Sequence, residues 1–111
     1  MTTTREISDE SGTFIDALYA RCDQNSRAEA IDLALWYLDD LLSAEKHREC
    51  DAVLGLLDPS RLAPSVLVAI LGITRRMEYK VGRNRFFAWT MARVEKVKGK
   101  RYARQLLEKY R

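Results

Sequence analysis

The sequence has little of what marks membrane-spanning, disulfide-bonded or metal-binding proteins. Its longest apolar run, Val66 to Ile73, spans eight residues, far short of the roughly 20 that a membrane-spanning helix needs. Two cysteines, Cys22 and Cys50, are too few for a disulfide framework and lie in no CxxC or CxxH spacing. We expect both cysteines to be core residues, and we expect no membrane anchor, no metal and no other cofactor.

Catalytic signatures are also missing. The single histidine, His47, stands among charged residues at an expected polar hairpin tip, where acid or base catalysis would lack a positioned partner and a sheltered pocket. No Gly-rich phosphate loop, nucleophile elbow or HExxH motif occurs. The adjacent carboxylates Asp39 and Asp40 point apart on a helix. The sequence therefore predicts that the protein is not an enzyme. Only a pocket with several ionisable groups would favour catalysis again.

The composition is that of one folded domain. The chain has 111 residues, 47% hydrophobic and 32% charged, with five glycines and two prolines, so neither disorder nor a long linker is indicated. Residues 1–11 show no apolar period and are expected to form a frayed N-terminal tail, followed by a single helical domain over 12–111. The start is polar and acidic, without the order of a signal peptide, which favours a cytoplasmic protein.

Charge is divided unevenly along the chain. Residues 1–60 hold five Lys or Arg against thirteen Asp or Glu, a balance of −8, whereas residues 61–111 hold fourteen against three, a balance of +11. Such asymmetry indicates an anionic partner for the basic half. The alternative is that the two halves attract each other, either within the fold or head to tail between copies.

Apolar residues at helical spacing predict an all-α fold of five to six helices, packed as consecutive antiparallel helical hairpins. The expected helices cover 13–23, 26–42, a segment after a break at 43–45 that stops at Asp58-Pro59, 64–80, 84–98, and a last segment through Tyr110. Because Val66 to Ile73 is apolar on every side, the fourth helix should lie at the centre of the fold.

Four helix starts carry capping signals. Ser26 and Glu29 form an S-x-x-E capping box, and Thr13 with Asp16 resembles one. Pro64 suits the first turn of a helix, where its missing N–H costs nothing. Asn84, after the loop 81–84, is the expected cap of the fifth helix.

Helical hairpins start about 37 residues apart, within the range of helical repeats. The segment LLSAEKHRECDAVLGLLD, Leu41 to Asp58, resembles the turn and second helix of a tetratricopeptide repeat, with Cys50 at the position of a small residue and Leu54 at a bulky one. The tryptophan and glycine pattern of that family's first helix is missing. The resemblance implies a helical protein-interaction scaffold without catalysis.

The fifth helix separates into two arcs when its residues are placed at about 100° steps. One arc predicts the core face: Phe86, Phe87, Thr90, Met91, Val94 and Val97. The other gathers four cations around a tryptophan: Arg85, Trp89, Arg93, Lys96 and Lys100. Three arginines at the end of the fourth helix and in its loop extend this candidate basic surface: Arg75, Arg76 and Arg83.

Such a basic surface can hold phosphates while its indole stacks on a base, which makes nucleic acid or another polyanion a candidate partner. The plainer interpretation is a solvated face with Trp89 folded over the core edge. In the second helix, Trp36 is expected to fill a gap between hairpins. If it is exposed instead, it becomes a candidate partner anchor.

These observations leave three classes of function. The leading hypothesis is a non-catalytic protein–protein interaction module, a small adaptor or complex subunit whose protein partner the sequence does not identify. The alternatives are binding of nucleic acid or another polyanion through the basic half, and a homo-oligomer held by the opposed charges of the two halves.

Overall fold

The computed structural model describes residues 7–110, and every regular element in this range is helical. The predicted all-α fold is confirmed. None of these helices has the length and apolar character that crossing a bilayer requires. The element bounds are α1 Asp9–Asp23, α2 Arg27–Ser43, α3 His47–Leu56, the 3₁₀ turn η1 Pro59–Arg61, α4 Pro64–Ile73, the 3₁₀ turn η2 Thr74–Arg76, α5 Val81–Lys98 and α6 Lys100–Tyr110.

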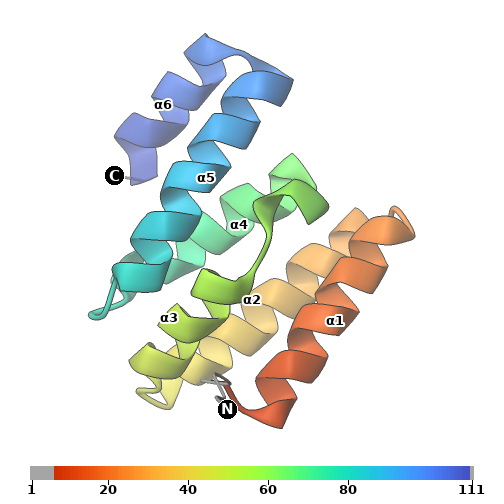
Figure 1. Cartoon of the computed structure of the whole chain (residues 1–111), viewed down its shortest axis with the longest axis vertical. Coiled ribbons are helices and arrows are strands. Elements are labelled where there is room, and N and C mark those ends of the chain that lie inside the picture. The colour runs from red at the N-terminus through yellow and green to blue at the C-terminus, as the bar shows by residue number, and fades with distance from the viewer. Residues whose placement is uncertain (1–6, 111) are drawn as a thin grey trace, which may run out of the picture.

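Consecutive helices form antiparallel hairpins, and the first two connections use the same turn (Figure 1). Asn25 after α1 and Glu45 after α2 adopt positive φ angles of 61° and 60°. In both turns the next residue donates its amide to a carbonyl five residues earlier, at 2.8 Å. This hydrogen bond satisfies a carbonyl at the helix end. A break between α2 and α3 is present as predicted, but it covers residues 44–46 and not 43–45.

The hairpin α2–α3 stacks on the hairpin α4–α5. α2 packs along α4 and α3 packs along α5, while α1 covers α2 and α6 returns beside α5 (Figure 1). The two hairpins start at Arg27 and Pro64, 37 residues apart. The packing of consecutive helical hairpins is therefore as predicted, and the resemblance to a tetratricopeptide repeat stays a prediction.

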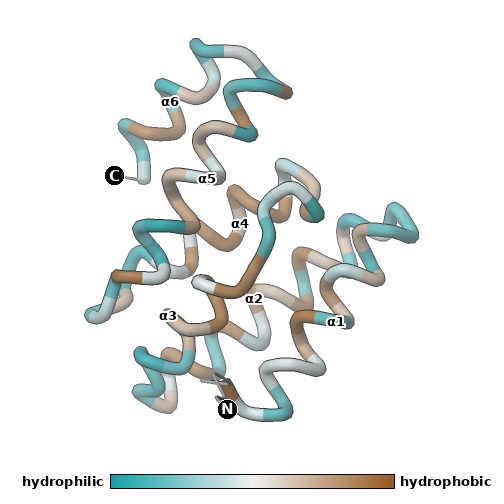
Figure 2. Tube along the Cα trace, in the orientation of Figure 1, coloured by the Kyte–Doolittle hydropathy of each residue, from teal (hydrophilic) through white to brown (hydrophobic). Residues whose placement is uncertain are grey.

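Buried apolar side chains from all six helices form one hydrophobic cluster. Apolar segments gather where α2, α3 and α4 meet, whereas the turn between α1 and α2 is hydrophilic (Figure 2). α4 contributes four fully buried residues and so lies centrally, as predicted, although its other apolar residues are half-buried. The four are Val66, Leu67, Ile70 and Leu71.

Both cysteines are free thiols. Cys50 is buried, and its thiol donates to the Met77 sulfur at 3.8 Å. Burial, followed by the nearby Asp51 carboxylate, raises the pKa of Cys50 to about 12, so its thiol stays protonated. Cys22 is half-buried and packs against the edge of the core. The expected core role is therefore met fully by Cys50 and partly by Cys22.

α1 begins earlier than predicted. Ser8 is its N-cap, and the Ser8 hydroxyl accepts the Ser11 amide at 3.1 Å. Asp9 and Glu10 fill the first turn, where negative charge favours the helix dipole. The expected start at Thr13 is wrong, and so is a frayed tail that reaches residue 11. The part of that tail over residues 1–6 lies outside the described residues.

Two further predictions about helix ends need correction. Ser26 stands at the N-cap of α2, but its side chain makes no capping hydrogen bond. α4 starts at Pro64 as predicted but ends at Ile73 rather than at Lys80. At this end the Thr74 hydroxyl donates to the Ile70 carbonyl at 2.7 Å, and the chain tightens into η2.

α5 begins at Val81, three residues before the predicted cap Asn84. Its first amides are capped by a residue of another helix. The buried Asp51 of α3 accepts the Gly82 amide at 2.7 Å and the Arg83 amide at 2.9 Å. A carboxylate at this position also complements the positive end of the α5 dipole. The segment predicted as a loop is therefore the first turn of α5.

Candidate functional site

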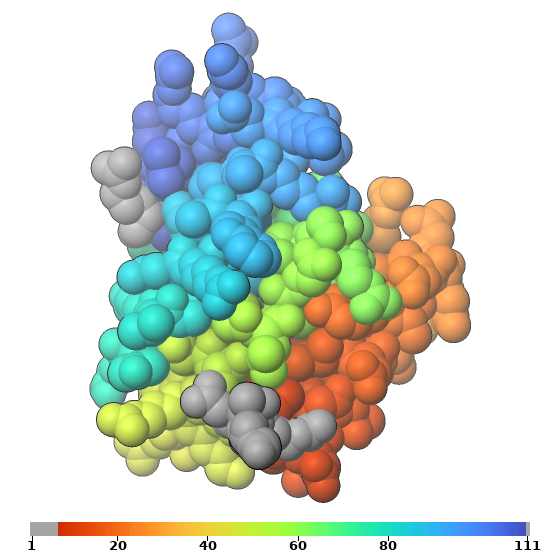
Figure 3. All heavy atoms as spheres, viewed as in Figure 1, coloured from red at the N-terminus to blue at the C-terminus, as the bar shows by residue number. Residues whose placement is uncertain are grey.

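One flank of α5 faces solvent next to α3 and η1, on the side of the molecule that Figure 3 shows. Val81, Arg85 and Trp89 follow each other at four-residue spacing, so they share one side of the helix. Val81 is 69% exposed and Trp89 is 51% exposed. The Arg85 guanidinium lies over the Trp89 ring at 5.0 Å from its centroid. The predicted adjacency of Arg85 and Trp89 is present in the structure.

A groove of 560 Å³ runs between α3 and the start of α5. Leu56, which is 55% exposed, lies on its α3 side, and Tyr79 and Val81 lie on the other. Arg48 and Arg85 also line the groove, and the Arg48 guanidinium lies over the Tyr79 ring at 5.4 Å. Exposed apolar and cationic side chains therefore alternate along this groove.

A second hollow of 340 Å³ continues the same flank between α5 and η1. Trp89, Arg93 and Lys96 line it from α5, and Asp58 with Pro59 lines it from η1. Arg93 is half-buried because its Nε donates to the Leu62 carbonyl at 3.3 Å. We call the surface that joins both hollows the α3–α5 face. Its exposed residues are Arg48, Leu56, Ser60, Tyr79, Val81, Arg85, Trp89, Ala92 and Lys96.

The carboxylates beside this face are already engaged. Asp51 caps α5, and Glu49 accepts the Ser8 amide at 2.8 Å. Asp58 accepts the amide and hydroxyl of Ser60 at 3.0 and 2.7 Å, and these bonds lower the pKa of Asp58. These carboxylates keep their negative charge, but Asp51 is buried and Glu49 and Asp58 are half-buried, so the fully exposed charges of the face are cationic.

Arg83 does not belong to any exposed surface, and its prediction as a site residue is wrong. It is 5% exposed, and its guanidinium donates to the Thr74 hydroxyl and to the Leu71 and Tyr110 carbonyls at 3.2, 3.3 and 3.4 Å. Desolvation lowers the pKa of Arg83, and the nearby Arg75 lowers it further. Arg83 thus satisfies carbonyl groups near the C-terminal ends of α4 and α6.

The other predicted basic residues are divided among separate places. Arg76 forms an ion pair with Asp39 of α2 at 2.5 Å. Arg75 is exposed on η2. Lys100, at the start of α6, lines a third hollow with Met91 and Ala103. Only Arg85, Trp89, Arg93 and Lys96 come together as predicted.

On the predicted core side of α5, Val97 is 52% exposed because the last turn lies beyond the end of α3 (Figure 1).

Trp36 is 67% exposed, so the expectation that it fills a gap in the core is wrong. Its neighbour Tyr37 is buried instead, stacked on Phe14 at 4.4 Å between ring centroids. Exposed acidic residues surround Trp36 on the outer side of α2: Asp32, Asp39 and Asp40. Trp36 is therefore exposed, which is the condition under which it is a candidate partner anchor.

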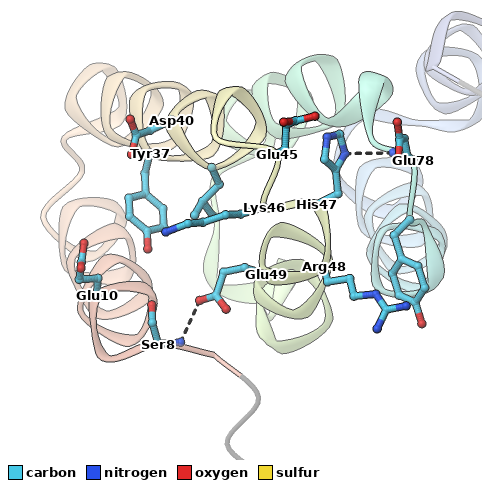
Figure 4. A pocket seen from close by; sticks show the side chains of 12 residues that line it. Ser8, Glu10, Tyr37, Asp40, Glu45, Lys46, His47, Arg48, Glu49 and Glu78 are labelled. Carbon is cyan, nitrogen blue, oxygen red and sulfur yellow. Dashed lines mark hydrogen bonds between the residues drawn. The ribbon is translucent and has the colours of Figure 1, made fainter.

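A larger hollow of 840 Å³ lies where the start of α1 meets the α2–α3 turn (Figure 4). It contains several ionisable groups, and Lys46 extends across it toward Tyr37. His47 is half-buried rather than fully solvated, since its Nδ1 accepts the Glu78 amide at 3.2 Å. Within residues 7–110, no three His, Cys, Asp or Glu side chains are placed to hold a metal ion.

The ordered centre of this hollow is a hydrogen-bonded chain. The Ser11 hydroxyl donates to Glu49 at 2.5 Å and lies 2.7 Å from the Tyr37 hydroxyl. Burial acts to raise the pKa of Glu49, but hydrogen bonds from Ser11 and Ser8 outweigh it and lower that pKa. Ser11 is fully buried, so a substrate has no access to its hydroxyl. This chain fastens α1 to α3.

Arg48, Leu56 and Tyr79 belong to the α3–α5 face but are not among the site residues predicted from the sequence. Leu56 and Tyr79 come from two different segments, and only the crossing of α3 and α5 brings them to one groove. The sequence carries little signal for them, since the predicted fourth helix, 64–80, includes Tyr79, which in the structure lies in the loop that lines the groove. Comparisons of the chain with protein-family models, with curated proteins and with solved structures find no match.

Proposed function

We propose that this protein is a non-catalytic protein-interaction module, a small adaptor or complex subunit that binds its partner through the α3–α5 face. The observation that carries this proposal is the exposure of Leu56, Val81 and Trp89 on rigid helices, at 55%, 69% and 51%. Large apolar side chains gathered at one exposed place are typical of interaction sites. Cationic side chains border them, as polar groups border many interfaces.

The construction of the face supports tight binding. Asp51 anchors the first turn of α5, and η1 supports the middle of that helix. A surface carried by fixed helices loses little conformational entropy when a partner docks. The free thiols Cys22 and Cys50 fit a reducing compartment, and we propose that the protein acts in the cytoplasm.

Site-specific photocrosslinking tests this function. A photoreactive residue at Val81, within the face, is compared with one at the exposed Gln105 of α6, in extract from the source cells. We expect a discrete protein adduct from position 81 that survives nuclease treatment and is absent from position 105. Adding Trp89→Ala to the Val81 variant should weaken the adduct. An adduct formed only with a second copy of the chain, or no adduct at all, would contradict the proposal.

Polyanion binding is the second candidate function, and one observation favours it. Within residues 7–110, no carboxylate forms an ion pair with Arg85 or Lys96, the cations on either side of Trp89. These groups can therefore accept phosphates while the indole stacks on a base.

Fluorescence anisotropy with labelled single- and double-stranded oligonucleotides tests this candidate. Binding should weaken steeply between about 50 and 200 mM salt, because phosphate contacts release counterions. Arg85→Glu should weaken it further, and the matched charge reversal Arg104→Glu on α6 should have less effect. A flat titration at the lower salt concentration removes this candidate.

A further inference from the structure

The α3–α5 face has the length of a helical ligand. Its residues on α5 extend from Val81 to Lys96, about 22 Å at 1.5 Å per residue. The two hollows lie end to end along this distance, the first against α3 and the second against η1. A segment of about four helical turns would cover both.

The apolar residues of the face follow one another along its length, with Arg85 between Val81 and Trp89 on the same side of α5. Leu56 and Val81 border the first hollow, and Trp89 borders the second. An amphipathic helix contacts such residues with side chains at positions i, i+3 or i+4, and i+7. A nucleic acid would stack on Trp89 but would leave the aliphatic Leu56 and Val81 without apolar contacts. The chemistry of the face therefore favours a protein segment.

Charge decides the composition of that segment. Three cations of the face are exposed: Arg48, Arg85 and Lys96. The carboxylates that line the two hollows lie deeper, since Asp51 is buried and Glu49 and Asp58 are half-buried. Acidic side chains at the flanks of a docked helix would meet these cations. Basic side chains would meet like charge, which disfavours a wrong partner.

We infer that the α3–α5 face is a docking groove for an acidic amphipathic helix of a partner protein. This inference rests on the proposed function and adds the chemistry of the partner. It assigns Leu56, Val81 and Trp89 to the apolar contact and Arg48, Arg85 and Lys96 to recognition of Asp and Glu.

Selection from a display library of helical peptides tests the inference, with the full chain as the target. The library places random residues on one helix face. We expect the enriched peptides to be acidic, with apolar residues spaced three or four apart. Their affinity, measured by anisotropy of the synthesised peptides, should fall at least about tenfold in Trp89→Ala and in Arg85→Glu, as hot-spot residues do.

Two matched variants separate a loss of the groove from a general effect. Trp36→Ala removes the other exposed tryptophan, and Arg104→Glu makes the same charge reversal on α6. Both should bind the selected peptides within about twofold of the wild-type chain. Circular dichroism of all four variants should show intact helices, since each changed side chain is exposed.

The outcomes distinguish this inference from the proposed function. If peptides are enriched but are basic, or lose binding in Trp36→Ala instead of Trp89→Ala, the acidic-helix inference is wrong and the protein-interaction function stands. If no peptide is enriched while labelled oligonucleotides bind through Arg85, both are wrong, and the face recognises a polyanion. If neither peptides nor oligonucleotides bind, both proposals also fail.

Discussion

The two sides of α5 differ sharply although their residues alternate along one helix. On the inner side, Gly82 and Arg83 are buried, and their amides donate to Asp51. On the outer side, Val81 and Arg85 are exposed, and neither is held by a hydrogen bond from another helix. The inner side therefore sets the stability of the fold, and the outer side is free to contact a partner.

Gly82 marks the closest approach of α5 to α3, and replacing it should break the inner side most severely. A Cβ atom at this position would lie 2.1 Å from the Asp51 carbonyl oxygen. Because backbone atoms cannot swing aside, the two helices must separate. We expect Gly82→Ala to lower the free energy of unfolding by about 3 kcal/mol, as severe overpacking does. Denaturant unfolding followed by circular dichroism measures this change.

Gly55 provides the matched control, since it faces Gly82 across the same crossing. Its added Cβ would lie 3.8 Å from the Gly82 Cα, an ordinary contact. Gly55→Ala should therefore change stability by less than about 1 kcal/mol, with a gain in helix propensity acting in its favour. Equal losses at both glycines would show that the crossing is not limited by Gly82.

Asp51 should give the second-largest effect. Asp51→Asn keeps one acceptor oxygen but places an NH₂ group against a backbone amide and removes the charge at the α5 N-terminus. We expect a loss of about 2 kcal/mol, typical of a buried charged acceptor and a helix cap together. The comparison variant is Asn84→Ala, which removes the cap that the sequence suggested. Because Asp51 performs the capping, Asn84→Ala should cost less than about 0.5 kcal/mol in the same unfolding measurement.

Glu49 accepts an amide at the start of α1 as Asp51 does at the start of α5, but its side chain is half-exposed. Replacing Glu49 should therefore lower stability by less, and the loss should depend on pH. Its hydrogen bonds lower the pKa in the folded state, so the carboxylate stabilises the fold above the ordinary glutamate pKa. That stabilisation is lost as the pH falls through the lowered pKa. Partial exposure limits it to about 1 kcal/mol at neutral pH.

Unfolding curves of the wild-type chain and of Glu49→Gln between pH 2 and 7, about the range in which carboxylates titrate, check this prediction. The difference between the two proteins should shrink as the pH falls, because protonation removes the advantage of the carboxylate. Glu29→Gln, at an exposed site of α2, should show no such difference. A constant gap between wild type and Glu49→Gln at every pH would contradict a role for the charge.

The smallest effect on stability belongs to the outer side. Trp89→Ala removes an exposed indole that lies under the Arg85 guanidinium. We expect a change in unfolding free energy within about 0.5 kcal/mol, as for most surface substitutions. Trp36→Ala on α2 should behave alike. A loss of several kcal/mol in Trp89→Ala would mean that the α3–α5 face belongs to the core and is not free for a ligand.

Local features of the chain were predictable. The breaks after α1 and α2, the start of α4 at Pro64 and the pairing of Arg85 with Trp89 depend on residues within a few positions of each other. The apolar run in α4 was enough to place that helix in the core, because no other environment removes so many aliphatic side chains from water.

Other features depended on residues far apart in the chain. The start of α5 is set by Asp51, which lies 31 residues before Gly82. The burial of Arg83 depends on carbonyls at Leu71 and Tyr110, and the exposure of Trp36 depends on which side of α2 the other helices cover. Helical periodicity orders side chains around one axis but does not say which sides of that axis receive neighbours. The packing of whole helices against one another decides which sides are covered. The candidate docking face therefore exists only in the tertiary structure.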